Sequence, residues 1–226
     1  MPAKNTIKQY KENGYYHIYN RGVEKRLTFQ DSQDYSVFLS YLKEYLSPKN
    51  EQELREKLSN LETSYKEKDK IIKILRLNNF SGEITLIAYC LMSNHFHLFI
   101  KQANSQSINK FMQSFTTRYT AYFNRKYKRV GSLFQATYKA VLIAQEEQFV
   151  LLSKYIHKQA LALQGLTLQG QPSSYSEYLG LRNTEWIHPE EILSYFSKTN
   201  PSLSYKSFVE SELDDYESIK NALIED

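Results

Sequence analysis

Two histidines separated by one apolar residue, His95 and His97, lie in the run YCLMSNHFHLFI at residues 89–100. The run is rich in strand formers, and side chains two apart on a β-strand point to the same face. A strand here directs Phe96, Leu98 and Ile100 to one face, and His95, His97 and Phe99 to the other. Two neutral imidazoles side by side on a strand make half of a metal site. Spacing alone leaves a buried core pair equally open, so the metal site depends on further ligands elsewhere.

Composition narrows the class of protein. The 226 residues are enough for one large domain or two small ones, and the net charge of +4 permits a nucleic-acid partner without requiring one. The single cysteine, Cys90, excludes an internal disulfide framework. The first residues lack the apolar segment of a secretory signal, and no apolar run approaches membrane-spanning length. We therefore expect a cytoplasmic protein with no membrane partner.

Hydrophobic periodicity and turn signals predict an alternation of strands and helices. The predicted strands are 14–19, 83–91, 95–101 and 134–143, and the predicted helices are 32–46, 107–127 and 146–163. The link 92–94 is short enough for an antiparallel hairpin. Shorter helical pieces are predicted at 173–180, 189–196 and 205–213. The order of elements predicts an α+β fold, ferredoxin-like in outline, with helices packed on at least one face of the sheet.

Residues 47–79 differ in character from the rest of the chain. Ser47-Pro48 ends the preceding helix, and a highly charged stretch with spaced leucines and isoleucines follows. This pattern predicts an inserted solvated helix or helical hairpin without catalytic chemistry. We expect a main domain over 1–170, interrupted at about 47–79, and a C-terminal helical extension over 171–226.

The end of the helix predicted at 107–127 is basic and aromatic. The cations are Arg118, Arg125, Lys126, Lys128 and Arg129, and the rings among them are Tyr119, Tyr122, Phe123 and Tyr127. Cations that track phosphates and rings that stack on bases are typical of a single-stranded nucleic-acid site. A solvated charged face is the alternative. Arg21 and Lys25, at the turn after the first strand, are further candidates for phosphate contacts, and a solvated loop explains them equally well.

The helix predicted at 146–163 offers a partner for the two histidines. Tyr155 and Gln159 are four residues apart and therefore share one helix face. The carbonyl oxygen of Gln159 completes a His-His-Gln site for Mg²⁺ or Mn²⁺ with His95 and His97, and water or phosphate oxygens fill the other positions.

Tyr155 is then the candidate nucleophile, because a phenol can form a covalent phosphodiester and the metal polarises the phosphate under attack. Lys154 and Lys158 flank it and are candidates to hold DNA phosphates. The alternative is that Tyr155 is merely one of 19 tyrosines and Gln159 an ordinary helix residue.

Several stretches together resemble the single-tyrosine HUH transposases of insertion sequences, and within them most of all the REP-associated tyrosine transposases. These stretches are LMSNHFH at 91–97, YIH at 155–157, YHIYNRG at 16–22, GSLFQ at 131–135, YKA at 138–140, SSY at 173–175 and YLG at 178–180. The resemblance spans about residues 14–212 and skips the insertion at 47–79.

The resemblance implies a palm-like antiparallel sheet packed by helices, the HUH endonuclease fold. The paired histidines of the family correspond to His95 and His97, its nucleophile to Tyr155, and its third ligand to Gln159. The implied activity is DNA transposition, a form of DNA recombination. Such a transposase cuts single-stranded DNA near an imperfect, REP-like hairpin and leaves a 5′-phosphotyrosine link and a free 3′-OH. Reversal at a new junction then needs no ATP.

The chain departs from that family branch at Gln159-Ala160, where Asn-Pro is common. Glutamine keeps a carbonyl ligand but changes its reach, and loss of the proline changes how the helix ends. A monomer and a homodimer both remain open, as do a mobile and a domesticated role. The main alternative function is a non-catalytic single-stranded nucleic-acid-binding protein. A structural zinc protein fits poorly with one cysteine and five histidines.

Overall fold

The structure is a computed structural model that describes residues 10–135, 137–161 and 172–211. In these residues one antiparallel sheet of four strands has the order β2-β3-β1-β4. The strands are β1 (Tyr15–Arg21), β2 (Ile84–Met92), β3 (His95–Gln102) and β4 (Lys139–Ile143). Strand β3 lies between β1 and β2 and is antiparallel to both, which is the split βαβ arrangement of ferredoxin-like folds. The predicted α+β fold is confirmed.

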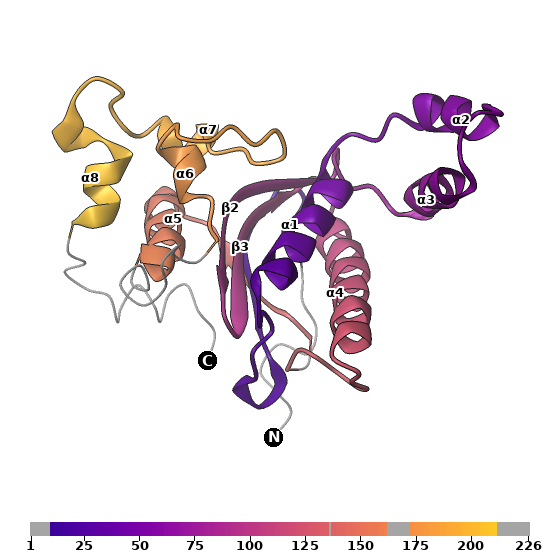
Figure 1. The fold of residues 1–226 in the computed structure, drawn as a ribbon. Helices are drawn as coiled ribbons and strands as arrows, with labels where there is room; N and C mark the ends of the chain where they lie inside the picture. The colour runs from indigo at the N-terminus through magenta and orange to yellow at the C-terminus, as the bar shows by residue number, and fades with distance from the viewer. Residues whose placement is uncertain (1–9, 136, 162–171, 212–226) are drawn as a thin grey trace.

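Helices cover both faces of this sheet (Figure 1). One face carries α1 (Ser32–Leu46) and α4 (Ser107–Lys126). The other carries α5 (Glu146–Leu161), with the short helices α6 (Tyr175–Tyr178), α7 (Glu190–Leu193) and α8 (Tyr205–Glu210) outside it. Two 3₁₀ turns, η1 (Val23–Lys25) and η2 (Pro201–Leu203), complete the described elements. No helix within the described ranges is both long and apolar enough to cross a membrane.

The predicted helix at 32–46 is confirmed at both ends, and Asp31 caps it by accepting a hydrogen bond from the backbone N–H of Asp34. The strand predicted at 134–143 begins only at Lys139, because Phe134 instead forms an isolated bridge to Gly22. The last residues predicted for two helices, 162–163 and 212–213, lie outside the described residues. The division into a domain at 1–170 and an extension at 171–226 stays a prediction.

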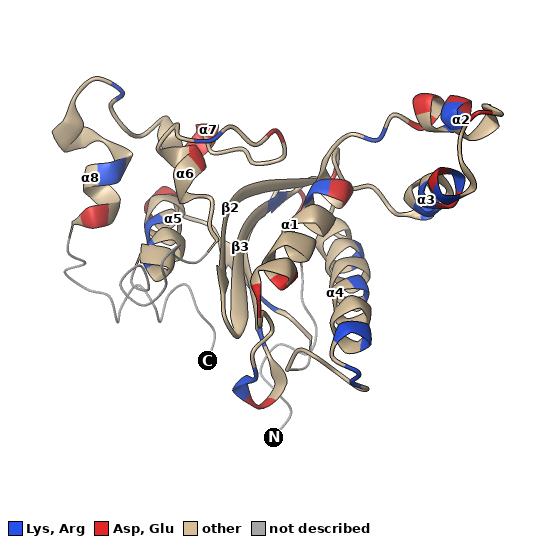
Figure 2. Cartoon of the chain, viewed as in Figure 1, with Lys and Arg blue, Asp and Glu red and all other residues tan. Residues whose placement is uncertain are grey.

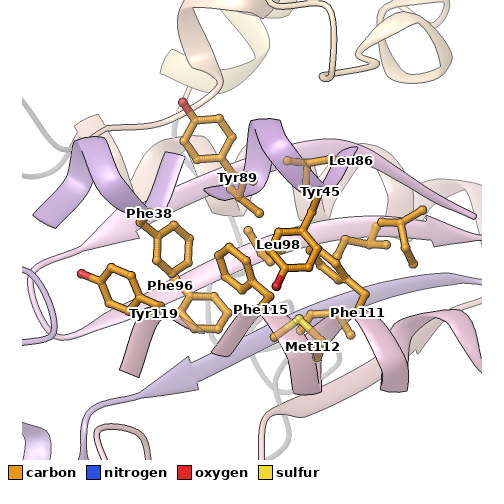
Figure 3. Packing of buried hydrophobic residues seen from close by; sticks show 14 of the residues in the cluster. Phe38, Tyr45, Leu86, Tyr89, Phe96, Leu98, Phe111, Met112, Phe115 and Tyr119 are labelled. Carbon is orange, nitrogen blue, oxygen red and sulfur yellow. The ribbon is translucent and has the colours of Figure 1, made fainter. Parts of the chain in front are cut away.

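Alternation along β3 sorts its side chains between two apolar clusters. Phe96, Leu98 and Ile100 enter the cluster beneath α1 and α4, where aromatic rings pack densely (Figure 3). Phe99 enters the cluster beneath α5. The predicted facing of the strand is therefore confirmed, and the histidines lie on the α5 side. A bulge in β2 turns both Ile87 and Ala88 toward this same side.

The hairpin link between β2 and β3 is held by the segment that follows β1. The carbonyl of Ser93 accepts hydrogen bonds from the backbone N–H groups of Thr28 and Phe29, at 2.9 and 3.0 Å. The N–H of Gly22 donates to the carbonyl of Asn94 at 2.8 Å. A Cβ at Gly22 would lie 2.2 Å from the carbonyl oxygen of Arg26, so only glycine fits this close approach. The start of the histidine strand is thereby anchored.

The charged insertion forms a helical hairpin of α2 (Glu51–Ser59) and α3 (Tyr65–Arg76) that projects away from the sheet (Figure 1). This agrees with the second of the two predicted forms. Its two ends are close together, because the Asn79 amide donates to the Ser47 carbonyl at 2.7 Å and the Phe80 N–H to the Tyr45 carbonyl at 2.8 Å. Its buried Ile71 belongs to neither apolar cluster of the sheet.

A buried carboxylate joins the start of α1 to the end of α4. Asp34 is 0% exposed and accepts hydrogen bonds from the hydroxyls of Tyr122 and Tyr127 and from the ammonium of Lys126, at 2.9, 2.8 and 2.8 Å. Lys126 also contacts Asp31 at 2.7 Å. Part of the predicted basic cluster is thus engaged in holding two helices together.

Asp34→Ala should lower the free energy of unfolding by about 3 kcal/mol, because it removes the buried acceptor of two tyrosine hydroxyls and one of the two carboxylates that hold the Lys126 ammonium. Urea denaturation of the purified proteins measures the change. Asp69→Ala is the matched control, since it removes an exposed i,i+4 pair with Lys73 and should leave the midpoint unchanged. Equal effects of the two substitutions would contradict this account.

Replacing residues 51–76 with a short Gly-Ser linker should leave the fold intact, because the ends of the insertion are already held together by backbone contacts. The thermal midpoint should change by no more than about 5 °C, and the far-ultraviolet circular dichroism should lose only the helical signal of α2 and α3. Loss of a cooperative transition would show that the hairpin supports the sheet.

Candidate functional site

The structure brings a tyrosine to the histidines of β3. The rings of His95 and His97 are nearly perpendicular, with centroids 5.0 Å apart. The ring of Tyr155 on α5 meets that of His97 edge to face at 5.5 Å. His97 is 3% exposed and Tyr155 is 4% exposed. Tyr155 shares its apolar cluster with Ile156, the next residue of α5, because the C-terminal helices cover α5 from outside.

A third histidine joins this pair from the neighbouring strand. His17 on β1 lies parallel to His97 at 5.0 Å between ring centroids, and its Nε2 is 2.8 Å from Nδ1 of His97. His17 is completely buried. The other ring nitrogen of His97, Nε2, is buried with no hydrogen-bond partner among the described residues. Such an atom is a candidate metal ligand.

His95 is oriented by the residue before it. Its Nδ1 is 2.6 Å from Oδ1 of Asn94. The NH₂ group of the same amide donates to the carbonyl of Lys25 at 3.2 Å, which turns Oδ1 toward the imidazole. An amide oxygen can only accept, so Nδ1 of His95 carries the proton and Nε2 carries the lone pair.

Both strand histidines are neutral at ordinary pH. Burial, and then the positive charge of Arg21, lower the pKa of His95 to about 4. Burial, and then the neighbouring imidazoles of His17 and His95, hold the pKa of His97 well below its ordinary value. Because only a neutral imidazole has a lone pair for a cation, this environment suits metal binding.

The predicted third ligand, Gln159, follows Tyr155 by one turn of α5 and is half-buried. Within the described ranges no group of three or more His, Cys, Asp and Glu side chains is placed to share a metal ion. A cation at the two histidines therefore needs an amide, a phosphate or water to complete its coordination. Two imidazoles combined with such oxygen donors are compatible with Mn²⁺ or Mg²⁺.

A second phenol lies as close to the imidazoles as Tyr155 does. Tyr19 stacks on His17 at 4.9 Å and on His97 at 5.8 Å between ring centroids. Sequence reasoning gave no role to Tyr19, His17 or Asn94. The available signal was that three of only five histidines fall in strand-like segments. Strand pairing, which puts Tyr19 opposite His97, is what brings the segments together.

One set of the predicted cations gathers at the His95 end of the sheet. Arg21 pairs with His95 in the strand register and is exposed. Backbone hydrogen bonds from Val23 to Leu133 and from Gln135 to Arg21 bring the segment after α4 to the same end. The exposed members of the set are Arg21, Lys25, Arg125 and Lys128, and Arg129 is half-buried. Blue segments mark these loops at the foot of Figure 2.

The other predicted cations contact the protein itself. Arg118 pairs with Glu44 at 2.6 Å, and Lys126 binds the carboxylates of α1 described above. Lys154 is 3% exposed and donates to the hydroxyl of Ser211 at 2.7 Å. Lys158 donates to the carbonyl of the same serine at 2.8 Å. Here they stabilise helix packing, and their predicted contacts with DNA stay predictions.

His157 fixes the rotation of α5. Its Nδ1 is 2.6 Å from the hydroxyl of Tyr205, and its Nε2 is 2.7 Å from the hydroxyl of Ser174. Ser174 also accepts a hydrogen bond from the backbone N–H of Tyr89 on β2 at 2.9 Å. Burial lowers the pKa of His157 to about 3, so it is neutral here. The contact ties α5 to the sheet and to α8, and it keeps Tyr155 turned toward the histidines.

Comparisons with known proteins identify a family. The model of the family "Transposase IS200 like" matches residues 37–159, more than half of the chain, and this range includes His95, His97, Tyr155 and Gln159. A solved structure of a REP-associated tyrosine transposase bound to a REP hairpin is similar over 89% of this chain and 97% of that chain, with 11% identity and a TM-score of 0.42. The chain matches no curated protein sequence at a significant level.

His157→Leu should lower the free energy of unfolding by about 3 kcal/mol, because the buried hydroxyls of Tyr205 and Ser174 both lose a partner. Denaturant titration measures the loss. The exposed His188 provides the control, and His188→Leu should stay within about 0.5 kcal/mol of the unsubstituted protein. An unchanged midpoint for His157→Leu would contradict its role in anchoring α5.

Proposed function

Because the chain belongs to the IS200-like transposase family, we propose that it is a metal-dependent, single-strand DNA endonuclease and strand transferase with Tyr155 as its nucleophile. The observation that carries this proposal is the edge-to-face contact between Tyr155 and His97. It joins a phenol from a late helix to two neutral imidazoles on a mid-chain strand. That combination matches the chemistry of phosphodiester transfer to a side-chain oxygen.

The metal ligands in this proposal are His95, His97 and Gln159. The Nε2 of His97 supports it: this buried nitrogen has no hydrogen-bond partner in the described part of the chain, and its lone pair is satisfied when a cation binds. Mg²⁺ or Mn²⁺, when bound, supplies polarisation of the scissile phosphate and offsets the charge that develops on it. Gln159 lies one turn after Tyr155 on α5, so in this proposal one helix supplies both the third ligand and the nucleophile.

The reaction exchanges one phosphodiester for another. The hydroxyl oxygen of Tyr155 forms a bond to phosphorus, and the bond between phosphorus and the 3′ oxygen breaks. The phenolic proton ends on the departing oxygen, which becomes a free 3′-OH. The 5′ phosphate stays on Tyr155, and attack by a 3′-OH at a new junction reverses the step. No external energy source is needed, because the tyrosine ester retains the energy of the original phosphodiester.

The DNA partner is supported by the cations at the His95 end of the sheet. Arg21, Lys25, Arg125, Lys128 and Arg129 lie there, and among the described residues they have no ion pair in the sheet or helices like those of Arg118 and Lys126. Phosphates of a single strand entering at this end would pass them before reaching the imidazoles. We extend the proposal to DNA with an imperfect hairpin, which is what the resemblance to REP-associated tyrosine transposases implies.

Tyr155→Phe should abolish a covalent protein–DNA adduct, because phenylalanine keeps the ring but has no oxygen to attack phosphorus. The substrate is a hairpin with single-stranded flanks taken from inverted repeats near the gene, labelled at its 3′ end, which is the part that stays on the tyrosine. Denaturing gels with Mn²⁺ present measure the adduct. Tyr19→Phe is the matched control and should keep the adduct within about threefold, since Tyr19 is the other phenol stacked on these imidazoles.

Several outcomes would contradict the proposal. An adduct that persists in Tyr155→Phe but disappears in Tyr19→Phe would move the nucleophile to β1. Chelation by EDTA should stop adduct formation in the unsubstituted protein, and an adduct that survives it would remove the metal from the mechanism. DNA binding that survives EDTA, with no cleavage under any divalent cation, would favour a non-catalytic nucleic-acid-binding protein.

A further inference from the structure

The Nδ1 atoms of both strand histidines are held by side chains that the proposed function leaves without a role. Asn94 meets Nδ1 of His95 at 2.6 Å, and His17 meets Nδ1 of His97 at 2.8 Å. A histidine that binds a metal through one nitrogen usually donates its other N–H to a neighbouring group, which fixes the tautomer and the angle of the ring. The contacts of Asn94 and His17 are of this kind, because each reaches the Nδ1 atom and leaves Nε2 for a metal.

The Asn94 contact determines the tautomer of His95. The amide cannot rotate freely, because its NH₂ group is already bonded to the Lys25 carbonyl, in the segment that follows β1. His95 must therefore donate from Nδ1. The orientation of this imidazole thus depends on the hairpin link, whose backbone is in turn bonded to Gly22 and Thr28.

The His17 contact is more buried and allows two proton arrangements. In one, Nδ1 of His97 donates to Nε2 of His17, and Nε2 of His97 keeps a lone pair. In the other, Nε2 of His97 carries an N–H that has no acceptor among the described residues. A buried donor with no acceptor loses its hydration without compensation, whereas a lone pair is compensated when a cation binds. The first arrangement is therefore the one compatible with metal binding.

We propose that His17 and Asn94 are positioning residues, which hold His97 and His95 in the Nδ1–H tautomer so that both Nε2 lone pairs are available to one cation. This inference rests on the metal-dependent function proposed above. It gives β1 a direct part in the site: the strand supplies the acceptor for His97, while Tyr19 of the same strand confines the ring by stacking.

The first test reads the tautomers directly, without metal or DNA. Imidazole ¹⁵N spectra of the metal-free protein near neutral pH distinguish protonated from unprotonated ring nitrogens. His95 and His97 should both show a protonated Nδ1. The exposed His188, whose Nδ1 faces Glu190 and no residue of the site, serves as the reference. A protonated Nε2 at His97 would overturn the proposal for His17, and the same result at His95 would overturn it for Asn94.

The second test measures Mn²⁺ affinity by calorimetric titration. His17→Phe keeps a ring of similar size but removes the acceptor, and it should weaken binding about 10- to 100-fold. His17→Gln restores an acceptor oxygen and should recover most of the loss. Tyr15→Phe is the matched control on β1, because the Tyr15 hydroxyl bonds Glu191 away from the histidines, and it should bind Mn²⁺ as the unsubstituted protein does. Unchanged affinity in His17→Phe would overturn the inference.

These outcomes separate the inference from the function on which it rests. If the unsubstituted protein forms the Tyr155 adduct while His17→Phe binds Mn²⁺ equally well, the inference fails and the function stands. If the unsubstituted protein neither binds Mn²⁺ nor forms an adduct, the proposed function fails, and the tautomer spectra still decide the part played by His17. Should His17→Phe fail to fold, Asn94→Ala in the half-exposed hairpin link provides the same affinity test for His95.

Discussion

The pairing register between β1 and β3 is the constraint on which the site depends. It places Tyr19 opposite His97 and His17 opposite Phe99, so that aromatic and imidazole rings of two strands form one layer. A shift by one residue would turn this layer to the opposite face. The apolar residues of the same strands prevent the shift, because Ile18, Phe96 and Leu98 are completely buried beneath α1 and α4. The aromatic core on one face thus enforces the chemistry on the other.

The second requirement is that α5 presents Tyr155 to this layer. A helix on an apolar sheet can rotate at little cost unless directional contacts hold it, and His157 supplies two such contacts, to Tyr205 and Ser174. Lys154 and Lys158 add a third attachment through Ser211. The C-terminal segment therefore holds α5 in place against the sheet. Its contribution to the site is mechanical, since Tyr205, Ser174 and Ser211 act by hydrogen-bonding side chains of α5.

Features set by neighbouring residues could be predicted from the sequence, whereas contacts between distant segments could not. The alternation of β3, the helix at 32–46 and the helical insertion follow from neighbouring residues, and all three were predictable. The places of His17 and Asn94 were not, because they depend on strand register and on a turn that closes against a distant segment. Chain order places Lys154 next to Tyr155, but it contains no information that α8 covers that side. The nearness of Tyr155 to His97 was expected chiefly from resemblance to a family.

The histidines of the proposed site are neutral, so the site has no charge of its own before a cation binds. The imidazoles of His95 and His97 are uncharged, and the positive charge of Arg21 acts on them from the rim. Two of the other predicted cations, Arg118 and Lys126, are paired with carboxylates of the protein itself. A divalent cation bound alone at such a site has only dipoles to offset its charge. A DNA phosphate offsets it directly, so metal and nucleic acid should each favour the binding of the other. The small net charge of +4 is enough for this arrangement, because the cations that remain exposed are concentrated at one end of the sheet.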